Sequence, residues 1–145
     1  MGVSNIKWCK NIHTFISNIL LKNGYKAKQI ILCGAHLPTI KDNTDSKYLA
    51  GARKEVDVNQ YERTLKTLEY NTRLKRMSRI NGFKYIDITK YIIGENGLVK
   101  DYYLNNDPTD HHLENSKIVN FWKKEIKSIC NLQKPKKLII KQNIL

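Results

Sequence analysis

Apolar residues recur at helical spacing in three stretches of the chain. The first covers residues 6–23, the second runs from about residue 57 to 80, and the third covers residues 118–130. Side chains three and four positions apart predict amphipathic helices with one buried face, and Gly24 and Gly82 are typical helix ends. The predicted buried faces are Ile6, Cys9, Ile12, Phe15, Ile16, Ile19 and Leu20; Val58, Tyr61, Leu65, Leu68, Leu74, Met77 and Ile80; and Ile118, Val119, Trp122, Ile126, Ile129 and Cys130.

Two shorter apolar runs predict strands. Ile30–Cys33 is unbroken, which indicates a strand buried on both faces, and residues 83–88 form the second run. Between them, the polar residues 41–56 predict a long exposed loop. Helices and strands alternate, which predicts an α/β fold with a parallel sheet between helices. Because two strands do not make a stable parallel sheet, we expect the fold to be incomplete at its N-terminus.

The positive charge of the chain is large but dispersed. The formal net charge is +13 over 145 residues, a length that fits one domain. Basic residues are spread along the whole chain without an RNA-binding aromatic signature or zinc-finger spacing, which argues against nucleic acid as the main partner. The alternative is a small basic, non-enzymatic protein for nucleic acid or another polyanion, binding phosphates through Lys123, Lys124, Lys127, Lys134, Lys136 and Lys137.

Cysteines and apolar segments bear on the compartment. Cys9, Cys33 and Cys130 are widely spaced and odd in number, which favours buried free thiols and a reducing environment. No apolar segment reaches the ~18 residues that a membrane span needs. The N-terminus shows no signal-peptide pattern. We therefore expect no transmembrane segment and favour a cytoplasmic protein.

Carboxylate and imidazole side chains gather just before the third predicted helix, at Asp107, Asp110, His111 and His112. Reactive residues of open α/β sheets lie beyond the carboxyl ends of strands. There, a carboxylate can orient a histidine that takes a proton from a nucleophile. Alternatives are an acid-rich helix N-terminus and a metal site. Adjacent histidines point in different directions on most backbones, which argues against both of them binding one metal ion.

This segment and the elements before it resemble the SGNH (GDSL-type) ester hydrolases. In that family an Asp and a His share one short loop near the C-terminus, commonly followed by Leu, and a helix then closes the domain. Three earlier segments are also similar to the family: Tyr70-Asn71 within a predicted helix, the predicted strand at 82–88, and Ile30–Pro38. The last of these resembles a family strand that ends near an active-site proline.

The resemblance implies a three-layer α/β/α sandwich with a parallel sheet of the flavodoxin-like type. Residues 1–132 would form a partial hydrolase-like domain and residues 133–145 a basic tail. The implied reaction is hydrolysis of an ester, such as an O-acetyl group on a carbohydrate or a lipid acyl ester, and the resemblance implies no metal or organic cofactor.

Within this resemblance, His112 is the general base and Asp110 its orienting carboxylate, with Asp107 and His111 in reserve. The family's usual spacing is D-x-x-H followed by Leu, as Leu113 follows here. Asp110 stands only two places before His112, so the identity of the carboxylate departs from the family pattern.

The family's nucleophilic serine has no counterpart in the sequence. It lies in a Gly-Asp-Ser block on the first strand, and this chain contains no such block. Gly2 and Asn5 resemble the family's G-x-N-D block, which contributes oxyanion donors, although Ser4 and Asn5 replace its usual asparagine and aspartate. We expect a truncated hydrolase, a domain completed by a separate N-terminal segment, or an inactive relative.

Overall fold

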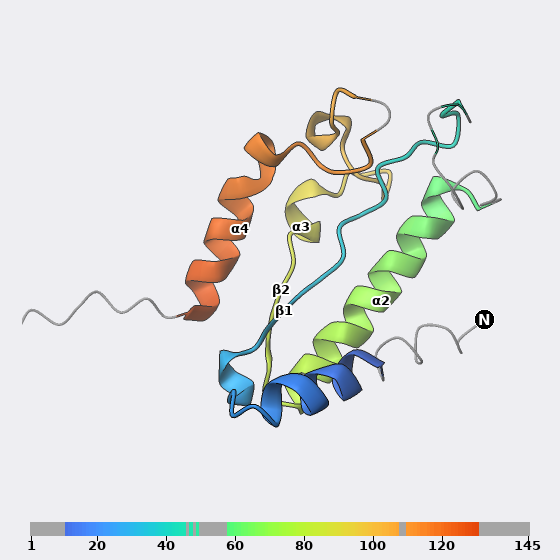
Figure 1. Ribbon diagram of the computed structural model, residues 1–145. Coiled ribbons are helices and arrows are strands. Elements are labelled where there is room, and N and C mark those ends of the chain that lie inside the picture. Colours follow the sequence, from blue (N-terminus) through green and yellow to red (C-terminus); the bar gives the residue numbers. More distant parts are fainter. Residues whose placement is uncertain (1–10, 46, 48, 50–57, 108–109, 131–145) are drawn as a thin grey trace, which may run out of the picture.

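The computed structural model describes residues 11–45, 47, 49, 58–107 and 110–130. Residues 11–15 are α-helical and continue into the π-helix η1 (Ile16–Leu21), and the 3-10 turn η2 (Ala27–Gln29) follows (Figure 1). The remaining elements, in chain order, are β1 (Ile31–Cys33), α2 (Gln60–Ile80), β2 (Lys84–Ile86), α3 (Thr89–Ile92), the 3-10 turn η5 (Asp101–Tyr103) and α4 (Asn115–Cys130).

The two strands form a parallel pair. Ile31 lies opposite Lys84 and Cys33 opposite Ile86, and α2 connects the strands in a β-α-β unit. Helices α2 and α4 both contact β2 and lie on either side of the strand pair in Figure 1. The predicted α/β character is therefore confirmed. Within the described residues the sheet has only two strands, fewer than the three-layer sandwich expected from the resemblance would contain.

The predicted elements agree with the structure better than the predicted burial does. Both strands, the helix ends at Gly24 and Gly82, and the last helix lie where the sequence places them. The expectation that Ile30–Cys33 is buried on both faces is wrong, as is the expectation that Cys33 is a buried thiol. Cys33 is exposed, and Ile31 and Leu32 are only half-buried.

Apolar side chains make two separate clusters. The larger one lies around α3 and the start of α4, and its fully buried members include Leu37 and Ile92 at 0% exposure. The smaller one joins η1 to the start of each strand through Ile16, Ile30 and Phe83. The larger cluster lies beyond the carboxyl ends of β1 and β2. The candidate site lies at this same end of the strands.

The predicted buried face of α2 is wrong in part: Leu74 is buried as predicted, but other members of that face are exposed. Tyr61 and Leu65 are 51% and 48% exposed, whereas a stripe that is mostly polar is buried. In the first and last helices, too, part of each predicted face is exposed, including Phe15, Ile19, Val119 and Ile126. The buried residues of α2 are Gln60, Thr64, Asn71, Leu74 and Ser78.

This polar stripe is buried because its side chains have partners. The hydroxyls of Thr64 and Ser78 donate to carbonyl oxygens one turn earlier in the same helix, at 2.8 Å each. Asn71 and Gln60 instead reach out of the helix to another segment. Most buried polar groups in proteins are hydrogen-bonded in this way, because an unpaired one costs free energy.

That segment is the β1 extension, which we define as residues 34–40. It continues from β1 after Gly34, whose amide makes a hydrogen bond of 2.9 Å to Ile86 O on β2. Asn71 then pairs with Ala35, donating to its carbonyl and accepting from its amide at 2.8 Å each. Further along, Gln60 Nε2 donates to the carbonyl of Pro38 and Arg63 Nη2 to that of Ile40. Side chains of α2 thus replace a strand partner.

Replacing Asn71 tests this pairing. Asn71→Ala leaves the Ala35 amide and carbonyl without their partner, so we expect a loss of roughly 1–3 kcal/mol in the free energy of unfolding. Thr72→Ala is the matched control, because Thr72 is exposed and its hydroxyl donates only within α2, to Leu68 O. The control change should stay within about 0.5 kcal/mol. Urea unfolding curves of both variants would contradict the account if the two losses were equal.

Candidate functional site

The candidate site is the histidine loop, which we define as residues 107–113, between η5 and α4. Its base is closed by an antiparallel bridge between Leu104 and Leu113, and the amide of Glu114 donates to Tyr103 O at 2.9 Å. Leu113 is buried in the larger apolar cluster. The loop is therefore anchored in the core at its C-terminal end, close to the point where α4 begins.

Asp110 and His112 form a hydrogen-bonded pair. Asp110 Oδ1 lies 2.7 Å from His112 Nδ1 and also accepts from the backbone amide of His112 at 2.8 Å. The second oxygen, Oδ2, accepts from Asn105 Nδ2 at 2.8 Å. With both oxygens engaged, the carboxylate has a fixed orientation toward the imidazole.

This arrangement determines the tautomer of neutral His112. An ionised carboxylate only accepts hydrogen bonds, so Nδ1 must carry the proton. The lone pair then lies on Nε2, where a general base needs it. The His112 side chain is 63% exposed, so its Nε2 face is open to a substrate or to another segment.

The same contacts keep Asp110 ionised. The hydrogen bond from the His112 amide is the largest cause, followed by that from the His112 ring, and both hold the pKa of the Asp110 carboxyl below its ordinary value. At neutral pH the carboxylate is therefore charged and can stabilise an imidazolium that forms beside it.

The β1 extension contacts the histidine loop through Thr39 and His36. Thr39 Oγ1 donates to the carbonyl of His111 at 2.6 Å, which fixes the backbone next to His112. His36 also lies there, with its ring centre 6.4 Å from that of His112. The sequence analysis did not select His36. Its position three residues beyond β1, at the carboxyl end of a strand, was the signal that could have identified it.

The remaining predicted residues have different surroundings. The ring centres of His111 and His112 lie 4.0 Å apart, so the expectation that these adjacent side chains point in different directions is wrong. Asp107 contacts Asp110 through its backbone, because its carbonyl accepts from the Asp110 amide at 3.1 Å. Gly2 and Asn5 lie outside the described residues.

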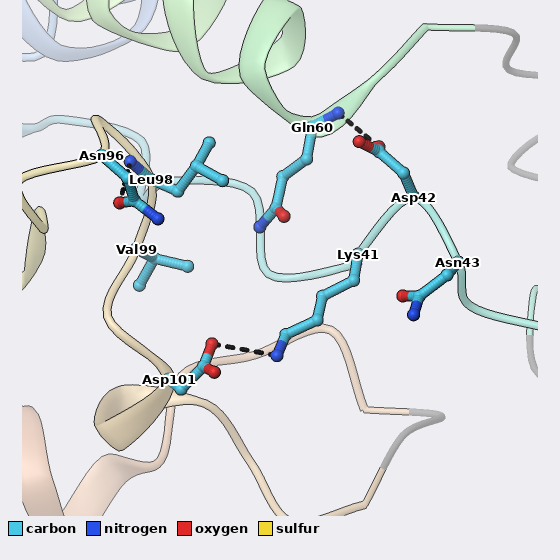
Figure 2. A pocket seen from close by; sticks show the side chains of 8 residues that line it. All are labelled: Lys41, Asp42, Asn43, Gln60, Asn96, Leu98, Val99 and Asp101. Carbon is cyan, nitrogen blue, oxygen red and sulfur yellow. Dashed lines mark hydrogen bonds and ion pairs between the residues drawn. The ribbon is translucent and has the colours of Figure 1, made fainter.

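Two cavities share Lys41, and the smaller of them adjoins the loop. The smaller, of about 230 Å³, is lined by Thr39, Asp107 and Asp110 together with residues 104–106. The larger, of about 360 Å³, is shown in Figure 2, where Lys41 reaches across it to Asp101 with their charged atoms 3.0 Å apart. Its lining is rich in amide and carboxylate groups: Lys41, Asp42, Asn43, Gln60, Asn96, Leu98, Val99 and Asp101.

Comparisons with known proteins add no relative: the sequence matches no protein-family model, no curated protein and no solved structure. Among the described residues, none of the helices has both the length and the apolar character that crossing a membrane requires.

The pKa of Asp110 offers a direct test of the pair. His112→Ala removes the ring donor but keeps the backbone amide, which is the larger cause, so the carboxyl pKa should rise only part of the way toward the ordinary value of about 3.9. Carbon-detected NMR of the Asp110 carboxyl measures it. Asp45, whose pKa is lowered by Lys47 instead, should titrate unchanged.

The lowered pKa of Asp110 makes the free energy of unfolding depend on pH. The folded chain favours ionised Asp110, so this contribution to stability is present above the unfolded carboxyl pKa and disappears as the pH falls through the lower folded-state pKa. A carboxyl pKa for Asp110 that is the same in the wild type and in His112→Ala would show that the ring does not contact it in solution.

Proposed function

We propose that this chain carries the acid–base half of an ester hydrolase of the SGNH (GDSL) type. The observation that carries the proposal is the hydrogen bond of 2.7 Å between Asp110 Oδ1 and His112 Nδ1, at the end of the molecule to which both strands lead. His112 is the general base and Asp110 orients it. The hydrogen bonds that Asp110 makes to His112 and Asn105 favour Asp110 over Asp107 as this carboxylate.

In the proposed reaction, His112 Nε2 takes the proton of a serine hydroxyl as the serine oxygen attacks the ester carbonyl. The protonated ring then gives that proton to the leaving alcohol, and a water molecule releases the acid by the reverse sequence. Gly2 and Asn5 are the proposed oxyanion donors. The serine belongs to a Gly-Asp-Ser block that this sequence does not contain.

The proposal implies a larger sheet than the described pair of strands. A flavodoxin-like sandwich requires further parallel strands beside β1 and helices over both faces. In the described residues β1 is paired on one side only, and large apolar side chains such as Phe15, Ile19 and Leu65 are exposed. Both features support a domain that an additional, serine-bearing segment completes.

Activity of the completed domain tests the function. The DNA upstream of Met1 is read in all three frames for a Gly-Asp-Ser block, the chain is produced joined to that block, and hydrolysis of p-nitrophenyl acetate is measured. We expect His112→Ala to lower kcat/KM by a factor of about 10³ or more. His13→Ala is the control, because His13 lies in the helical segment 11–15 and contacts Asn81 Oδ1 at 2.9 Å, outside the histidine loop.

Three outcomes would contradict the proposal. Full activity in His112→Ala would exclude His112 as the base. Loss of activity in His111→Ala but not in His112→Ala would transfer that role to the neighbouring histidine. A longer protein in which no serine is labelled by a fluorophosphonate would have no nucleophile for either residue to activate.

A further inference from the structure

The histidine loop brings together donor atoms of the kind that bind transition metals. Asp110, His111 and His112 each offer one ligand atom, and these atoms lie within 4.8 Å of one another. Imidazole nitrogen and carboxylate oxygen are the usual non-thiolate ligands of zinc. Neighbouring ligand atoms around a tetrahedral zinc ion lie roughly 3.4 Å apart, for zinc–ligand distances of about 2.1 Å. To bind zinc these side chains would rotate, and Asp110 would exchange its hydrogen bond to His112 Nδ1 for a bond to the ion.

The backbone and side-chain contacts hold these groups in place beforehand. Thr39 fixes the carbonyl of His111 at 2.6 Å, and Asn105 holds the carboxylate of Asp110 at 2.8 Å. The ring centres of His111 and His112 lie 4.0 Å apart with 39° between their planes, so both imidazoles are on the same side of the loop. Preorganisation of this kind lowers the entropy lost when a ligand binds.

His36 supplies a fourth possible ligand from a different segment. Its Nδ1 lies 3.0 Å from the carbonyl of Leu37, so Nδ1 is the protonated nitrogen of the neutral ring and Nε2 keeps the lone pair. A histidine whose other nitrogen donates to a carbonyl or carboxylate is the usual arrangement in metal sites. The rings of His36 and His112 are 6.4 Å apart, which places His36 at the rim of the cluster.

We propose that Asp110, His111 and His112, with His36 as the fourth ligand, bind one divalent zinc ion. This site is separate from the hydrolase function, because a bound ion would occupy the lone pair of His112 that proton transfer requires. Zinc would therefore inhibit the completed enzyme. The net charge of +13 opposes non-specific uptake of cations, so tight binding has to come from defined ligands.

Zinc titration of the whole chain by calorimetry, in competition with a chelator of known affinity, tests the site. We expect one ion per chain. His111→Asn and His112→Asn should each weaken binding by about tenfold or more, and His36→Asn should weaken it measurably. His13→Asn is the matched control and should bind zinc like the wild type, because His13 pairs with Asn81.

Thiols are the competing ligands, so Cys33→Ser is included because Cys33 is exposed. Unchanged affinity in His111→Asn and His112→Asn, or loss of binding in Cys33→Ser, would overturn the proposal. Ring signals of His111 and His112 that stay in place when zinc is added to the wild-type chain would do so independently of any folding defect in a variant. All these readouts are made without a serine nucleophile, so their failure leaves the hydrolase proposal standing.

Discussion

Hydrogen bonds between side chains of α2 and the backbone of the β1 extension position the rest of the candidate site. The strand pair ends at Cys33 and Ile86, and the backbone beyond β1 still carries polar groups that need partners. Asn71 forms hydrogen bonds with the amide and the carbonyl of Ala35, and Gln60 donates one to the carbonyl of Pro38. The extension therefore follows α2 in a defined path (Figure 1).

The opposite side of the extension is held by apolar packing. Leu37 is fully buried in the larger cluster, together with Ile92 and Leu113. Thr39, two residues further, then donates to His111. A continuous set of contacts thus runs from the polar stripe of α2 through the extension to the backbone beside His112. The orientation of the proposed base depends on residues that are distant from it in the sequence.

The pattern of apolar residues predicted both strands, α2, α4 and their order, because each depends on local sequence and on glycine at a helix end; it did not predict α3, η2 or η5. It could not predict the buried face of α2. Gln60, Thr64 and Asn71 resemble surface residues in the sequence, and their burial depends on partners that only the folded chain supplies.

The site was predicted in the same uneven way. Asp110 and His112 are close in sequence, so a short loop brings them into contact, and the structure shows the hydrogen bond between them. His36 comes from a segment more than seventy residues earlier in the chain, and its approach to His112 depends on the path of the β1 extension. The approach of the His111 ring to that of His112 depends on the local backbone path of the loop, which no sequence pattern specifies.

Amide hydrogen exchange at Ala35 tests most directly whether α2 acts as the partner of the β1 extension. The Ala35 amide donates to a side chain, Asn71 Oδ1, whereas the preceding amide, that of Gly34, donates to the strand at Ile86 O. If the side-chain pairing holds in solution, the Ala35 amide should exchange about as slowly as that of Gly34. Exchange at Ala35 at the rate of an unstructured peptide, beside a protected Gly34, would contradict it.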